Sequence, residues 1–159
     1  MRKNIILPIF GILILTVCVF FYFSEPSKKN TLKKVPKIIF EVNDFYNNKS
    51  IDENEFDNLY VINFFASWCK PCLIEHPLLL EMQQNGIKII GINFRDDLDN
   101  FEKWIEENGN PYEYVIVDSG DIAFQMGLIG VPETFFINKQ IIQKRIQGPL
   151  FYEDIKDYL

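Results

Sequence analysis

The sequence predicts an α/β fold in which a mixed sheet is flanked by helices. Short apolar runs that suit buried strands alternate with segments of helical periodicity, which is the pattern of parallel strands joined by helical crossovers. Two strand candidates near the C-terminus are separated only by a tight turn, which adds an antiparallel edge. With 159 residues, of which 48% are hydrophobic, the chain is long enough for one packed domain and an appendage.

The N-terminal segment differs from the rest of the chain. Arg2 and Lys3 precede an uncharged apolar run at 5–23. As a helix rising about 1.5 Å per residue, this run would span roughly 28 Å, close to the hydrocarbon core of a bilayer. We predict a transmembrane anchor at 5–23 after a short cytoplasmic N-terminus at 1–4. A cleaved signal peptide and a buried soluble helix are the alternatives, although the run ends without the small residues of a cleavage site.

Residues 24–37 are polar, rich in lysine and contain two prolines, which is typical of a linker to a folded domain at 38–159. Basic residues near a span favour the cytoplasmic side. The lysines of the linker outnumber Arg2 and Lys3, so the charge count alone mildly favours a cytoplasmic domain. The net charge of −6 argues against binding of nucleic acid through a broad basic face.

The first half of the domain contains three strand candidates and one long helix. The short apolar run at 38–42 predicts a strand, and the polar stretch at 45–58 predicts a turn or short helix. Residues 59–65, LYVINFF, form an unbroken apolar run typical of a strand covered on both faces. Apolar side chains recur at helical spacing over 72–84, and residues 87–93, IKIIGIN, predict another buried strand.

The second half continues the alternation. Residues 98–108 place three large apolar side chains on one helical face, and Gly109 ends that helix. The remaining elements are a strand at 114–117, a short helix at 120–126, strands at 133–137 and 140–146 joined at Asn138–Lys139, and a closing helix at 151–159.

The main candidate site is the pair Cys69 and Cys72 in FFASWCKPCLIEHP. A structural zinc site needs four ligands, whereas the chain offers one histidine, His76, and a third cysteine, Cys18, inside the apolar run. We therefore expect no metal. A disulfide between the pair would close too small a loop to stabilise the fold much. A C-x-x-C sequence between a buried strand and a helix is instead the thioredoxin-like arrangement for thiol–disulfide exchange.

The position of the pair accounts for its expected reactivity. A helix N-terminus carries a partial positive charge and unpaired N–H groups, which stabilise a thiolate. We expect Cys69 to be the exposed attacking thiol and Cys72 the less exposed resolving thiol. Lys70 adds a positive charge, and Pro71 fits an early helical position. The redox-active Cys69–Cys72 dithiol or disulfide needs no separate cofactor.

Four nearby side chains bear on this part of the candidate site. Trp68 is expected to cover the cysteines and contact substrate, the alternative being a core aromatic. Asn63 in the preceding strand cannot ionise, so Glu75, one turn beyond the pair, could supply a carboxylate that takes the proton from Cys72. The alternative for Glu75 is a solvated helix acid. We expect His76 to be structural or on the surface.

A second segment, GLIGVPETFFIN, supplies the expected substrate loop. A proline just before a strand often marks a cis bond, the alternative being an ordinary trans turn. In a thioredoxin-like fold this loop faces the cysteines. The backbone of Val131, next to Pro132, could then pair with an extended substrate. We expect Glu133 to make the mouth of the site acidic and so attract basic partners.

Four segments together resemble the CcmG/DsbE family of membrane-anchored, thioredoxin-like proteins of cytochrome c maturation. These segments are FFASWCKPCLIEHP, GINFRDD, ENGNPYEYVIVDSGD and GLIGVPETFFIN. The resemblance covers 36–159 together with the N-terminal anchor. It implies a thioredoxin fold with an extra N-terminal β element and a central insertion, and it places the domain in the periplasm on a single-pass anchor in the inner membrane.

The resemblance also implies an activity. Such a protein reduces the C-x-x-C-H cysteines of apocytochrome c before haem attachment, and a membrane reductant of the DsbD/CcdA type re-reduces it. The partners would be the apocytochrome segment or its maturation carrier. The family's roles fall on Cys69 as attacking thiol, Cys72 as resolving thiol, Glu75 as the acid and Val131–Pro132–Glu133 as the substrate loop. Many members carry a histidine where Gln147 stands here, so a role for that histidine does not transfer.

Two other functions remain open from the residues. The chain could be a general membrane-tethered periplasmic thiol:disulfide oxidoreductase or a ResA-like protein. It could also be a redox-inactive scaffold that binds apocytochrome or a maturation partner, although the intact cysteine pair argues against this.

Overall fold

The computed structural model describes residues 11, 13–16, 33–156 and 158. It divides the chain into two units, Met1–Thr31 and Leu32–Leu159. Within the first unit the described residues are helical, while most of the expected anchor at 5–23 lies outside the described part. Among the residues described, we find no helix that combines the length and the apolar character needed to cross a membrane.

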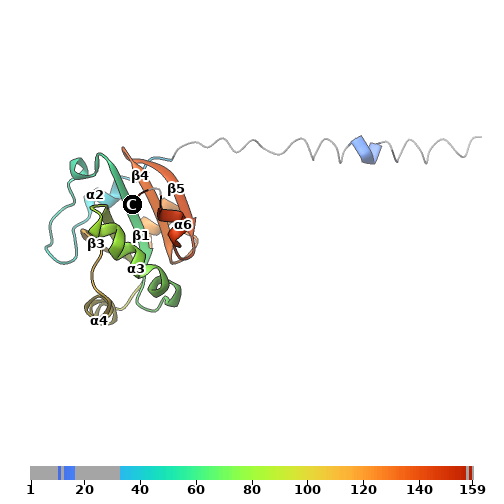
Figure 1. The fold of residues 1–159 in the computed structure, drawn as a ribbon. Coiled ribbons are helices and arrows are strands. Elements are labelled where there is room, and N and C mark those ends of the chain that lie inside the picture. The colour runs from blue at the N-terminus through green and yellow to red at the C-terminus, as the bar shows by residue number, and fades with distance from the viewer. Residues whose placement is uncertain (1–10, 12, 17–32, 157, 159) are drawn as a thin grey trace, which may run out of the picture. The chain divides into compact units, whose positions relative to one another are not determined.

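The second unit is built on a mixed sheet of five strands in the order β3-β2-β1-β4-β5. The central strand β1 (Leu59–Phe65) pairs in parallel with β2 (Lys88–Phe94), which pairs in parallel with β3 (Tyr114–Asp118). On its other side β1 pairs antiparallel with β4 (Glu133–Asn138), which pairs antiparallel with β5 (Ile141–Gln147). Strands β1, β4 and β5 lie side by side in Figure 1. The mixed sheet is as predicted.

Helices flank both faces of this sheet. They are α2 (Ile38–Glu41), the 3-10 helix η1 (Glu53–Phe56), α3 (Lys70–Gln84), α4 (Leu98–Asn108), α5 (Asp121–Met126) and α6 (Tyr152–Ile155). Alternate residues of β1 divide the core because successive side chains of a strand point to opposite faces. Val61 and Phe65 pack in a cluster with α3, α4 and α6, whereas Ile62 and Phe64 pack in a cluster with α2, η1 and α5.

The strand predicted at 38–42 is wrong, because these residues form helix α2. A short apolar run cannot be assigned to strand or helix by periodicity alone. One helical turn buries Ile39 completely in the core cluster that also contains residues of η1 and α5. In place of the expected N-terminal β element, the described residues form two isolated antiparallel bridges, one between Lys34 and Ile141 of β5 and one between Asn43 and Ser50.

The ends of the domain also differ from the expected bounds. The last residues of the expected linker pack on the domain, because Val35 is buried and its N–H donates to the carbonyl of Gln140 over 2.9 Å. The closing helix α6 is one turn long rather than reaching 159, although residues 157 and 159 lie outside the described part. The central insertion stays a prediction.

Candidate functional site

The cysteine pair lies where β1 passes into α3. Cys69 is the N-cap residue of α3, and its Sγ accepts a hydrogen bond from the backbone N–H of Cys72 over 3.2 Å. Pro71 lies in the first turn, where its missing N–H leaves no helical bond unmade. The two cysteines are joined by a disulfide bond, so the structure describes the oxidised form. The expected position of the pair at the helix N-terminus is confirmed.

Both cysteines are buried in this oxidised form. Cys69 is 3% exposed and Cys72 is 1% exposed. The expectation of an exposed Cys69 is therefore wrong here, although the order of exposure is as expected. The physical reason is that both sulfurs belong to the core cluster between the sheet and α3, against which Val131 also packs. Of the two residues, Cys69 has the slightly larger exposed fraction.

Glu75 is the acid of the site. It is fully buried on the same face of α3 as Cys72, one turn further along, which excludes a solvated helix acid. Its Oε1 accepts a hydrogen bond from Nδ2 of Asn63 over 2.7 Å, and its Oε2 accepts one from the N–H of Leu150 over 2.8 Å. Burial raises the pKa of Glu75 to about 7, while these two hydrogen bonds favour the charged form and oppose that rise. This carboxyl group can thus gain or lose a proton near neutral pH.

Asn63 connects Glu75 to two further buried side chains. Its Nδ2 also donates to Oγ1 of Thr134, and its Oδ1 accepts from the hydroxyl of Tyr112, each over 3.0 Å. The Tyr112 ring lies over β2 at Gly91, where an added Cβ would come within 2.7 Å of the ring. Burial, with a contribution from the Glu75 charge, raises the pKa of Tyr112 well above its usual value. Both donors and the acceptor of this amide are therefore used, which fixes its orientation.

His76 has a structural role, as expected. Its Nε2 lies 3.0 Å from the carbonyl of Gly109, so this nitrogen carries the proton and donates. The ring packs edge-on against Trp104, and burial lowers its pKa. Among the described residues, no group forms a hydrogen bond with its Nδ1. These contacts join α3 to the end of α4. The His76 ring thus packs between two elements and has no part in the exchange chemistry.

The loop before β4 contains a cis peptide bond between Val131 and Pro132. The sequence left the cis and trans states of this bond open, and the structure has the cis state. The Pro132 carbonyl accepts a hydrogen bond from the N–H of Gly148 over 3.0 Å. Val131 packs against the core cluster that contains the disulfide, so the loop lies beside the cysteine pair.

Glu133 does not make the mouth of the site acidic, and that expectation is wrong. Its side chain is fully buried. Its Oε1 accepts a hydrogen bond from Nε of Arg145, with which it forms an ion pair, and its Oε2 accepts one from the N–H of Ile129 over 3.0 Å. The antiparallel pairing of β4 with β5 brings the guanidinium beside the carboxylate. The negative charge is thus paired inside the domain instead of facing a partner.

Trp68 is 57% exposed, which excludes a core aromatic. Its Nε1 donates to the carbonyl of Arg95 over 3.1 Å. The residue before it is held by Asp96, whose Oδ1 accepts from Oγ of Ser67 over 2.6 Å and whose other oxygen accepts from the Ser67 N–H. Ser67 and Asp96 were not among the residues expected at the site. Asp96 is a polar residue just after the end of β2, and the loops that follow parallel strands meet at one edge of the sheet.

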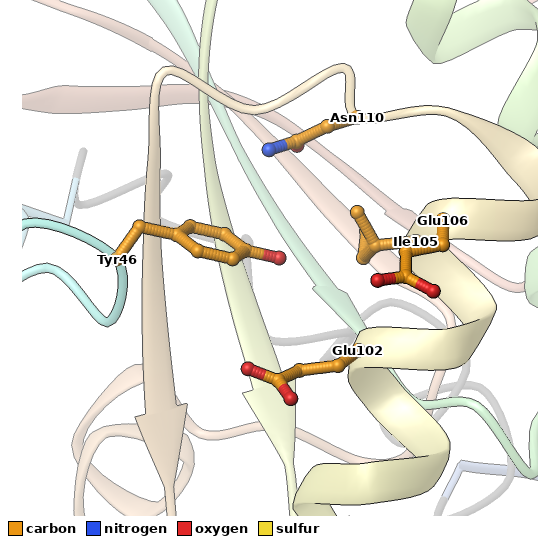
Figure 2. Close-up of a pocket in the computed structure, with 5 residues that line it drawn as sticks. All are labelled: Tyr46, Glu102, Ile105, Glu106 and Asn110. Carbon is orange, nitrogen blue, oxygen red and sulfur yellow. The ribbon is translucent and has the colours of Figure 1, made fainter.

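A separate hollow of about 270 Å³ lies on α4, lined by Tyr46, Glu102, Ile105, Glu106 and Asn110. Figure 2 shows the Tyr46 hydroxyl directed toward the side chains of α4. Partial burial and the nearby carboxylates raise the pKa of this hydroxyl. None of the lining residues belongs to the disulfide or to the substrate loop, so the redox chemistry lies elsewhere.

The fold and the site together define a thioredoxin-like protein with a disulfide centre at a helix N-terminus, a buried acid behind it and a cis-proline loop beside it. The chain belongs to the AhpC/TSA family, whose pattern it matches over residues 32–145.

Individual relatives agree with this class. The thiol:disulfide interchange protein HelX of Rhodobacter capsulatus is 42% identical over 92 residues, which make up 57% of this chain and 52% of that protein. The thiol:disulfide interchange protein DsbE of Haemophilus influenzae is 26% identical over 159 residues, covering 93% of this chain and 88% of that protein. The crystal structure of StoA from Bacillus subtilis has a TM-score of 0.62 at 22% identity and covers 74% of this chain and 93% of that one. The chain spans about half the length of the first curated relatives that it matches.

Proposed function

We propose that this protein is a thiol:disulfide oxidoreductase that reduces the C-x-x-C-H cysteines of apocytochrome c before haem attachment. The observation that carries the proposal is the disulfide at the N-terminus of α3 with fully buried Glu75 one turn behind it. A thiol pair in this position can exchange electrons, and an acid with a pKa near 7 can exchange the accompanying proton. The names of the relatives support the exchange reaction.

The proposed reaction starts from the reduced protein. The Cys69 thiolate attacks one sulfur of the substrate disulfide, which forms a mixed disulfide and releases a substrate thiolate. Glu75, in its charged form, takes the proton from Cys72. The Cys72 thiolate then attacks Sγ of Cys69, which releases the second substrate thiolate and forms the Cys69–Cys72 disulfide. The substrate gains two electrons and the protein loses two.

The proposed cycle and location complete this function. A membrane electron carrier of the DsbD/CcdA type returns two electrons to the Cys69–Cys72 disulfide. Residues 5–23 anchor the chain in the inner membrane as a single span, with residues 38–159 in the periplasm. The sequence resemblance supports this orientation over the small lysine excess after the span.

A trapping experiment tests the substrate. In the reduced full-length chain, Cys72→Ser removes the resolving thiol, so a mixed disulfide through Cys69 should accumulate. The probe is an oxidised peptide with the C-x-x-C-H sequence, and the adduct is measured by mass spectrometry. Cys69→Ser is the matched control and should trap nothing. Equal trapping of unrelated disulfide peptides would favour a general or ResA-like oxidoreductase, and no adduct with any peptide would favour a scaffold.

The direction of exchange needs its own measurement. The reduction potential of the Cys69–Cys72 couple should lie below that of the peptide disulfide, because electrons pass from the couple of lower potential to the couple of higher potential. A difference of about 30 mV changes a two-electron equilibrium tenfold. Equilibration of the protein with the peptide at several ratios gives this difference directly. A couple clearly more oxidising than the peptide would exclude the reductant role.

A further inference from the structure

The segment just before the cis proline is exposed, but its backbone forms hydrogen bonds with side chains of β4 and β5. Ile129 has a side chain that is 76% exposed, while its N–H donates to Oε2 of Glu133 over 3.0 Å. Arg145 donates through Nη2 to the carbonyl of Gly127 over 2.7 Å and through Nε to Oε1 of Glu133. Two hydrogen bonds therefore attach this short surface segment to the side chains of Glu133 on β4 and Arg145 on β5, and a third joins these two side chains to each other.

Arg145 is suited to this task for geometric reasons. It lies opposite Phe135 in the β4–β5 register, so its side chain reaches Glu133 on the same face, two residues along the partner strand. Its guanidinium group lies 5.2 Å from the Phe135 ring, which restricts its position further. A planar guanidinium presents several donors at fixed angles, and an ammonium group does not. One side chain can therefore bind the carboxylate and the Gly127 carbonyl together.

We propose that Arg145 is a positioning residue for substrate binding: through Glu133 and Gly127 it fixes the backbone of residues 127–131, against which a disulfide-bearing peptide pairs in extended form. The proposal rests on the proposed function, because pairing of the substrate with Val131 is part of it. The ligand class is a peptide disulfide, as opposed to a small disulfide with no backbone to pair.

The contacts of Arg145 separate this role from the chemistry. Its side chain donates hydrogen bonds to the segment before the cis proline and to Glu133. The hydrogen bonds of the disulfide loop and of Glu75 involve other groups, namely the Cys72 N–H, Asn63 and the Leu150 N–H. Loss of the guanidinium should therefore weaken peptide binding and leave exchange with a small disulfide unchanged.

The test compares two substrates for the reduced full-length protein. For Arg145→Lys we expect KM for an oxidised C-x-x-C-H peptide to rise by about tenfold with kcat nearly unchanged, since mispositioned binding groups affect binding of the substrate more than the chemical step. The rate with a small aromatic disulfide should stay within about twofold of wild type, because it makes no backbone pairing. Arg145→Met should show the same split with a larger rise in KM.

Lys144→Met is the matched control, because Lys144 is the next cation on β5 and contacts Asp154 instead of the loop. It should leave both rates unchanged. If Arg145→Met does not fold, Arg145→Lys decides the question, since a lysine keeps the charge near Glu133. An unchanged KM for the peptide, or an equal loss with both substrates, would overturn the positioning role. A wild-type protein that reduces neither substrate would overturn the proposed function as well, so the two failures are distinguishable.

Discussion

Two buried glutamates, Glu75 and Glu133, lie in the two regions that make up the site. Both are fully buried, and each accepts one backbone N–H, from Leu150 and from Ile129 respectively. They differ in the second partner. The other oxygen of Glu75 faces the neutral amide of Asn63, whereas the other oxygen of Glu133 faces the guanidinium of Arg145.

The partner decides what each carboxylate can do. A neutral amide compensates burial only in part, so the pKa of Glu75 rises to about 7 and the group can accept or release a proton during exchange. A guanidinium supplies a full opposite charge, and the carboxylate of Glu133 then serves as a fixed acceptor for the loop backbone. Burial alone is therefore a poor guide to catalytic function in a carboxylate.

The largest effect should come from breaking the ion pair. Arg145→Met leaves the Glu133 carboxylate buried without its partner, which should lower the free energy of unfolding by about 4 kcal/mol. Denaturant unfolding of the oxidised protein measures this loss. The double variant Glu133→Gln with Arg145→Met should recover much of it, because no charge remains buried. A double variant as unstable as the single one would show that packing, not charge, dominates this region.

The second effect is a pH dependence that comes from Glu75. Between about pH 4.5 and 7 the unfolded chain releases this proton while the folded chain retains it, so the free energy of unfolding should fall as the pH rises, by about 3 kcal/mol in all. Unfolding measured from pH 4 to 8 gives the slope. Glu75→Gln should remove this component, whereas Glu81→Gln, an exposed change on the same helix, should keep it. An identical slope in wild type and Glu75→Gln would contradict the assignment.

A third change should sharpen the contrast between the two glutamates. Asn63→Leu removes the hydrogen bond that stabilises the charged form of Glu75, so the pKa of Glu75 should move further up, by on the order of one unit or about 1.4 kcal/mol. Carboxyl infrared bands followed against pH report this shift. Thr134→Val is the control, because it removes another partner of Asn63 and leaves the bond to Glu75. A pKa that falls in Asn63→Leu would refute the argument.

The smallest effect should come from the outer part of the same network. Tyr112→Phe removes the hydroxyl that donates to Oδ1 of Asn63 and should lower the free energy of unfolding by about 1 kcal/mol. Tyr114→Phe removes a hydroxyl bonded to the exposed Glu55 and should cost less. Thermal unfolding of both variants makes the comparison. A larger loss in Tyr114→Phe would mean that the buried hydroxyl contributes little.

Much of the fold followed from the sequence because the periodic signals were long. The apolar run of β1 and the helical spacing of α3 each specify one structure, and both bounds are close to those expected. Helix α2 was missed because a run of five residues, four of them apolar, fits either a strand or one buried turn. The anchor at 5–23 stays a prediction, since it lies mostly outside the described residues.

The site was predictable where chemistry depends on local spacing. Cys69, Cys72 and Glu75 share one helix, so their positions follow from its periodicity. The surroundings of Glu133 depend on the register of two strands, which places Arg145 beside it, and spacing along the chain carries no such information. The link from Asn63 to Tyr112 likewise joins distant segments and requires the absence of a side chain at Gly91.

The short segment after β5 touches both regions at once. The N–H of Gly148 binds the carbonyl of Pro132 in the substrate loop, and two residues later the N–H of Leu150 binds the carboxylate of Glu75. Thermodynamic coupling between two sites is reciprocal. Any reordering of this segment by a bound peptide must therefore change the proton affinity of Glu75, and protonation of Glu75 must change the peptide affinity by the same free energy. One stretch of backbone thus links the carbonyl of Pro132 to the carboxylate of Glu75.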